Sequence, residues 1–292
     1  MNNRNVHRIL IPVDFSVAGQ CAVEYGAFLA NVFRADVLLL HILEGINSYP
    51  RNWFEGGADA SPKELLETRV TAKLAELADS ITKQYGIYVQ NVIKTGKPAA
   101  RIAEAVVERD LDLIVMGTHG LSGFEELFMG STAHKVVNMS PCPVITIPEG
   151  FKTSGFKTIV LPVDDTMHSR QKVSNVLPIA AKCNAVVHLL GLVNSNDKSD
   201  LNKFNIKLGT VEEAVKKAGL ACIKKVVKGT NIAIETMKYA QEVNAEMLAI
   251  MTDHESNMTG MFMGAFARQI VNHSKVPVMS IKPVTGPYES AA

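Results

Sequence analysis

The feature that most constrains the fold is an internal repeat. Three blocks of the first half return in the same order in the second half: 8–14 as 158–164, 94–96 as 227–229, and 137–147 as 271–281. Such repetition indicates two copies of one folding unit. The chain of 292 residues has room for two domains of ordinary size. We expect the boundary within 148–155, where glycine, proline and polar residues replace the periodic apolar ones, which gives domains over 1–150 and 151–292.

Short apolar runs alternate with helical patterns in the first copy. Five runs are strand candidates, at 9–13, 37–42, 89–93, 113–116 and 144–147. Between them, apolar residues recur at three- and four-residue steps, as on helices with one buried face. These stripes are Cys21, Tyr25, Leu29 and Val32; Leu66, Val70, Leu74, Leu77 and Ile81; and Ile102, Ala105 and Val106. Ser61 and Glu64 have the spacing of a capping box at the start of the second helix, while 44–60 reads as a loop.

Strands that alternate with helices run parallel, because each crossover returns the chain to the same end of the sheet. Helices on both faces also explain why the strand candidates are continuously apolar. The predicted fold is therefore α/β, with two doubly wound, five-stranded parallel-sheet domains in tandem. Ligands of such sheets bind beyond the carboxyl ends of the strands. In the first copy those ends are Asp14, His41–Ile42 and Met116–Gly117.

A glycine-spaced loop follows the fourth strand candidate. Glycines stand at 117, 120 and 130, and Ser131-Thr132 follows the last of them, ahead of an apolar helical pattern at 136–137. Glycine allows the backbone to approach a ligand closely, and a helix N-terminus offers free N–H groups to an anion. The spacing favours a phosphate site, with a tight turn as the alternative for the first two glycines alone. It is not a Walker loop, since Pro98 follows Gly96-Lys97, and no G-x-G-x-x-G is present.

The pattern G-x2-G-x9-G-[ST], with an early strand that ends in Pro-Val-Asp, resembles the nucleotide-binding branch of the universal stress protein family. The resemblance covers nearly the whole chain as a tandem of two such domains. It implies that ATP, with or without Mg²⁺, is bound in the first domain. It also implies that the last strands of the two domains pair within the chain, as separate subunits do in dimers of the family. The site residues implied by position are Pro12, Val13, Asp14, Ile42, Met116, Gly117, His119, Gly120, Gly130, Ser131 and Thr132.

These residue types suit a nucleotide. Asp14 can accept hydrogen bonds from ribose hydroxyls or lie near a phosphate-bound Mg²⁺, and it can also cap the following helix. Ile42 and Met116 supply apolar walls on either side of the nucleoside, or are core residues alone. The resemblance assigns the phosphates to Gly120, Gly130, Ser131 and Thr132. For His119 and His134 both readings stay open, a phosphate contact or a surface side chain with a local partner.

The second copy departs from the motif. Aligning Gly264 with Gly130 places Met251, His254 and Ala265 where the first copy has Gly117, Gly120 and Ser131. If each change costs about 1–3 kcal/mol, ATP binding weakens roughly a hundredfold to a millionfold. We therefore expect no ATP binding of this kind in the second domain. Metal-ligand atoms at Asp253, His254, Glu255 and His273 lack an established spacing, so no metal site is predicted.

Composition limits the classes of binding partner that we expect for this protein. Thirty Lys and Arg against 29 Asp and Glu leave a net charge of +1, unlike the concentrated basic surface of a nucleic-acid binder. No apolar run is long enough for a bilayer, and the polar start is unlike a secretory signal, so we expect no membrane partner and a cytoplasmic location. The four cysteines (Cys21, Cys142, Cys183 and Cys222) are scattered and are expected to be reduced.

Three functions remain. The first is an ATP-binding stress-response sensor or adaptor that is read by an unidentified protein partner. The second is a slow ATPase, although the stretch from Gly117 to His134 contains no Lys or Arg to stabilise phosphoryl transfer and no obvious base. The third is a carrier of another small ligand through the second domain. The sequence does not decide whether ATP is hydrolysed or whether two chains associate further as a homodimer.

Overall fold

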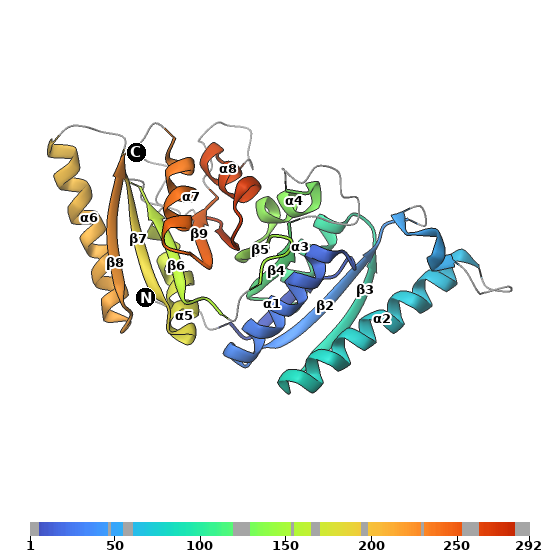
Figure 1. Ribbon diagram of the computed structural model, residues 1–292. Helices are drawn as coiled ribbons and strands as arrows, with labels where there is room; N and C mark the ends of the chain where they lie inside the picture. Colours follow the sequence, from blue (N-terminus) through green and yellow to red (C-terminus); the bar gives the residue numbers. More distant parts are fainter. Residues whose placement is uncertain are drawn as a thin grey trace.

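The computed structural model describes residues 6–45, 48–54, 61–118, 129–152, 155–164, 170–193, 198–228, 231–252 and 263–283. Within these ranges the two halves share a ten-stranded sheet in the order β3-β2-β1-β4-β5-β10-β9-β6-β7-β8 (Figure 1). Each half contributes five neighbouring strands that run parallel to one another. The predicted α/β fold with two parallel-sheet domains in tandem is confirmed.

The first half contains five strands and four α-helices in the described ranges. In chain order they are β1 (Arg8–Pro12), α1 (Val17–Phe33), β2 (Asp36–Leu43), the short 3-10 helix η2 (Arg51–Phe54), α2 (Pro62–Tyr85), β3 (Val89–Thr95), α3 (Pro98–Arg109), β4 (Leu113–Gly117), α4 (Ser131–Met139) and β5 (Val144–Ile147). All five strand candidates are present. Within the predicted loop over 44–60 the structure contains the short helix η2, where Arg69 of α2 donates to the Asn52 carbonyl oxygen at 2.8 Å.

The second half repeats this order. Its elements are β6 (Thr158–Val163), α5 (Val173–Cys183), β7 (Val186–Val193), α6 (Lys198–Lys217), β8 (Cys222–Lys228), α7 (Ile232–Glu242), β9 (Met247–Met251), α8 (Ala265–His273) and β10 (Val278–Ile281). None of the helices in the described ranges combines the length and the apolar character needed to cross a bilayer.

Local sequence explains where the helices begin. Ser61 and Glu64 form the predicted capping box: each side chain accepts a hydrogen bond from the other residue's backbone N–H. Ser16 caps α1 by accepting from the Gly19 N–H at 3.0 Å. Of the predicted α2 stripe, Leu66, Val70, Leu74 and Ile81 are buried and Leu77 is partly buried.

Helices cover both faces of the sheet, so strand residues point alternately into two cores. One core lies under α1, α2, α5 and α6, and the other lies under α3, α4, α7 and α8. In β1, for example, Ile9 and Ile11 enter the first core and Leu10 enters the second. This double cover accounts for the continuous apolar runs of the central strands.

The two halves join through their last strands. β5 and β10 pair antiparallel, with Ile145 opposite Met279. This is the intrachain pairing that the family resemblance implied. A second contact joins the halves at Phe156, which is fully buried and lies 5.3 Å, ring centroid to centroid, from Tyr25 of α1.

Phe156→Ala should lower the free energy of unfolding by about 3–5 kcal/mol, because the truncation leaves a cavity between the two halves. Urea unfolding followed by circular dichroism measures this. Phe151→Ala is the comparison, since Phe151 also approaches Tyr25 but is only partly buried, and it should cost less. Equal losses in the two variants would contradict the assigned role of Phe156.

Candidate functional site

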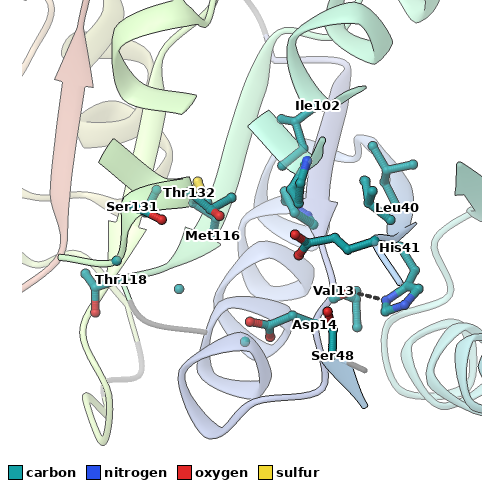
Figure 2. Close-up of a pocket in the computed structure, with 18 of the residues that line it drawn as sticks. Val13, Asp14, Leu40, His41, Ser48, Ile102, Met116, Thr118, Ser131 and Thr132 are labelled. Atoms are coloured by element: carbon teal, nitrogen blue, oxygen red, sulfur yellow. Dashed lines mark hydrogen bonds between the residues drawn. The ribbon is translucent and has the colours of Figure 1, made fainter. Parts of the chain in front are cut away.

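A cavity of about 500 Å³ opens at the carboxyl ends of β1, β2 and β4 (Figure 2). It lies where the strand order reverses, since β1 has β2 on one side and β4 on the other. Ligands of doubly wound sheets bind at this position. The lining residues are Pro12, Val13, Asp14, Gly19, Leu40, His41, Ile42, Glu44, Ser48, Tyr49, Pro98, Ile102, Met116, Gly117, Thr118, Gly130, Ser131, Thr132 and Ala133.

The structure brings the predicted site residues together. Those within the described ranges all line this one cavity: Pro12, Val13, Asp14, Ile42, Met116, Gly117, Gly130, Ser131 and Thr132. His119 and Gly120 lie outside the described residues. The part that each residue has in ligand binding stays a prediction.

One end of the cavity is the N-terminus of α4. Gly130 is the N-cap residue without a side-chain cap, and its N–H donates to the Thr118 carbonyl oxygen at 2.8 Å. The first-turn N–H groups of Ser131, Thr132 and Ala133 have no acceptor within the helix, as at any helix start. Together with two hydroxyls, these amides form a cradle for an anion. His134 is not part of it: its imidazole contacts the Asn138 side chain, and burial followed by the charge of Arg268 lowers its pKa.

Asp14 lines the cavity two residues after the end of β1. Its Oδ1 accepts from the Ser16 N–H at 3.0 Å and from the Ser16 hydroxyl at 2.7 Å. Ser16, not Asp14, is the cap of α1, so the capping alternative for Asp14 is corrected to support of the cap. A Cβ at Gly19 would collide with this carboxylate, so glycine is required there for Asp14 to keep its place.

Gly117 is needed for packing within the protein. A Cβ there would lie 2.8 Å from the carbonyl carbon of Ala18 in α1. In the sheet register Gly117 pairs with Ile147 as Met251 pairs with Ile281, so Met251 is the structural counterpart. Its side chain enters the core under α5 and α6. Met251 is therefore accommodated inside a core of the second half, and its effect on ATP binding stays a prediction.

The helix start differs more clearly between the halves. α8 begins with Ala265 and Phe266 where α4 has Ser131 and Thr132, so both hydroxyls are absent. Phe266 packs on the core under α7 and α8. Aligning Gly264 with Gly130 also places Phe266 opposite Thr132, and the sequence analysis did not consider this exchange. Of the metal-type cluster, only His273 lies within the described residues.

Sequence reasoning also missed the wall opposite α4. Buried His41 at the end of β2 bonds on both sides of its ring, since Nδ1–H donates to the Val13 carbonyl oxygen at 2.6 Å and Nε2 accepts from the Tyr49 hydroxyl at 2.8 Å. Burial lowers the pKa of His41, consistent with a neutral ring that donates at one nitrogen and accepts at the other. The loop reading of 44–60 hid Tyr49, and only the histidine at a strand end could have suggested this wall.

This arrangement defines a tandem α/β protein with a cavity at the switch point of its first half. A comparison with known protein families identifies the family within this class. The model of the universal stress protein family matches residues 5–148 and again 155–282. The chain belongs to the universal stress protein family, with two such domains in tandem.

Relatives match one half at a time. Universal stress protein YxiE of Bacillus subtilis is 28% identical over 151 residues, which cover 48% of this chain and 98% of the relative. Universal stress protein Sll1654 of Synechocystis is 31% identical over 140 residues, 48% of this chain and 84% of the relative. A universal stress protein from Archaeoglobus fulgidus shares the fold over both halves, with TM-score 0.75, 19% identity, and coverage of 94% of this chain and 98% of that one.

Gly117→Ala should destabilise the protein by about 1–3 kcal/mol, because the new methyl group meets the backbone of α1. Gly209→Ala in α6 is the matched control, since a Cβ there has open space and alanine favours a helix. Thermal and urea unfolding should therefore shift in opposite directions for the two variants. A stabilised Gly117→Ala protein would show that α1 does not pack as described.

Acid should weaken the fold partly through His41. The pKa of folded His41 lies below the ordinary 6.5, so below about pH 6.5 the unfolded chain binds more protons than the folded one. The contribution of neutral His41 to the free energy of unfolding is complete above about pH 6.5. It is lost as the pH falls through the pKa of His41 in the folded protein. Between pH 7 and pH 5, His41→Asn should unfold with a shallower pH dependence, by at most about 1.4 kcal/mol per pH unit. Parallel curves for the two proteins would contradict this assignment.

Proposed function

We propose that the first domain, over residues 1–150, binds ATP and that the protein acts as a nucleotide-dependent sensor or adaptor in the stress response. One observation carries the proposal: a single cavity joins a helix N-terminus, a carboxylate and an apolar strand-end pocket. These are the three chemistries that a triphosphate, a ribose and a base require. Family membership supports the same reading.

The cavity suggests how ATP would lie. Figure 2 shows Ser131 and Thr132 on one side and Leu40, His41 and Ser48 on the other, with Asp14 between them in this view. The phosphates would lie at the α4 amides and hydroxyls, where the helix dipole also favours negative charge. The base would then lie toward the apolar strand ends, and Asp14 would accept from the ribose.

The charges of the described lining residues do not favour phosphoryl transfer. Among the described lining residues there are two carboxylates, Asp14 and Glu44, and no Lys or Arg. Stabilisation of transferred phosphoryl charge needs cations aimed at it, and the described side chains supply none. A Mg²⁺ ion that accompanies the phosphates would reduce their repulsion with Asp14 and Glu44.

We propose that the second domain, over 151–292, does not bind ATP in this way. Ala265 and Phe266 leave the α8 N-terminus without hydroxyl donors. α5 begins only at Val173, well after Asp164, whereas α1 begins soon after Asp14. The wall that the first turn of α1 gives to the first cavity therefore has no equivalent among the described residues of the second half.

Isothermal titration should find one ATP site per chain, and Ser131→Glu should weaken it by roughly tenfold or more. The new carboxylate competes for the α4 amides and repels the phosphates, and 1.4 kcal/mol of repulsion is already tenfold. Ala265→Glu is the matched control: it puts the same charge at the same exposed position of α8 and should leave the affinity unchanged. Neither variant should destabilise the fold, because a carboxylate suits a helix N-terminus.

Nucleotide released from freshly purified, denatured protein identifies the natural ligand. Gly130→Glu protein should release much less of it than wild type. Two equivalent ATP sites, or equal affinity in the Ser131→Glu and Ala265→Glu proteins, would refute the assignment to the first domain.

A further inference from the structure

A second cavity, of about 450 Å³, lies at the amino ends of β4 and β5, at the opposite end of the strands from the first cavity. Both halves of the chain line it. The first half contributes Val6 and the segments that lead into β4 and β5, and the second half contributes Asn175 and Ile179 of α5 and Met279 of β10. We call this cavity the interhalf groove. Its lining is mostly apolar, and its volume is within the ~300–1,000 Å³ of ordinary ligand pockets.

The internal repeat gives the interhalf groove a counterpart across the β5–β10 pair. Asp112 Oδ2 accepts from the backbone N–H groups of residues 7 and 8, at 2.8 and 3.0 Å. Glu246 Oε2 accepts from the N–H groups of residues 157 and 158 in the same manner. The left-handed cap residues that end α1 and α5 keep the same spacing from these segments. The equivalent positions of the two places are therefore fixed.

Aromatic rings fill the counterpart. In this alignment Phe156 corresponds to Val6, and Tyr25 of α1 corresponds to Asn175 of α5. The rings of Tyr25 and Phe156 lie 5.3 Å apart, centroid to centroid, and both side chains are buried. In the interhalf groove the smaller Val6 and Asn175 are only partly buried. The groove is thus open where two rings pack in the other place.

The filled counterpart also shows which polar group suits such a place. Burial, followed by the charge of Glu246, raises the pKa of Tyr25, so the phenol hydroxyl lies within the influence of that carboxylate. Asp112 is the equivalent carboxylate in the interhalf groove. Asp110 also lines the groove and pairs with Arg8 at 3.0 Å, whereas the described lining contains no Lys or Arg. Such a lining favours a neutral hydrogen-bond donor and disfavours an anion.

We propose that the interhalf groove binds a small phenol. Its ring takes the place that Tyr25 has in the counterpart, and its hydroxyl donates to Asp112. The ring gains affinity by burying apolar surface against Ile179 and Met279, and the bond to Asp112 replaces the one that the hydroxyl gives up to water. This site is separate from the proposed nucleotide site, because the two cavities lie at opposite ends of the strands.

The probe is p-cresol, which is the tyrosine side chain as a free molecule. Ligand-observed NMR with the full chain should show saturable binding with a dissociation constant of about 1 mM, as expected for a ligand of this size. 4-Methylanisole has the same ring without a hydroxyl donor and should bind roughly tenfold more weakly. p-Toluate carries a negative charge toward Asp110 and Asp112 and should show no saturable binding.

Two variants close the groove with the residues of its counterpart. Asn175→Tyr and Val6→Phe each place a ring in the groove, from α5 and from the N-terminal side, and each should weaken p-cresol binding at least tenfold. Lys182→Tyr is the matched control, since it adds the same ring at an exposed position of α5 outside the lining. It should bind p-cresol like wild type. Circular dichroism identifies the variants that fold, and either groove variant alone is sufficient for the test.

Three results would overturn the inference. The first is a wild-type protein without saturable p-cresol binding. The second is unchanged affinity in a folded Asn175→Tyr or Val6→Phe protein, because the probe would then bind elsewhere on the chain. The third is equal affinity for p-cresol and 4-methylanisole, because the hydroxyl would then make no bond to Asp112 and the site would not select phenols.

Discussion

The close packing of α1 on β4 is the contact on which the first-half cavity depends. Gly117 has no side chain, so the first turn of α1 lies directly against the end of β4. That turn carries Ser16 and Gly19, which together hold Asp14 at the cavity. In the second half Met251 takes the position of Gly117, and α5 begins later after its strand. The exchange of Gly117 for Met251 thus accompanies a later start of the helix that follows the first strand of the half.

The sequence was sufficient for features that depend on local periodicity. Short apolar runs predicted all five strands of the first half, and Ser61 with Glu64 predicted a helix start to the residue. The spacing of glycines after β4 predicted that Gly130 would precede a helix, and Gly130 is the N-cap residue of α4. These succeed because a strand, a cap and a helix N-terminus are each set by residues close together in the chain.

The remaining features depend on contacts between distant segments. No sequence pattern around His41 predicts that its ring forms hydrogen bonds with Val13 and Tyr49. Both bonds form only when the residues after β1 and β2 come together in the folded protein. The packing role of Gly117 was missed for the same reason: a Cβ there would meet the Ala18 backbone, which no spacing rule includes. Periodicity therefore located the cavity edge, and only tertiary packing determined its walls.

The antiparallel pairing of β5 with β10 has a consequence for how such a protein can change. When two identical subunits meet about a symmetry axis, every mutation appears on both sides of the axis at once. Here the two partners are encoded in tandem, so each can be altered alone while the shared strand pair stays intact. The chemical asymmetry between the starts of α4 and α8 is of this kind, and dilution cannot separate the unequal partners.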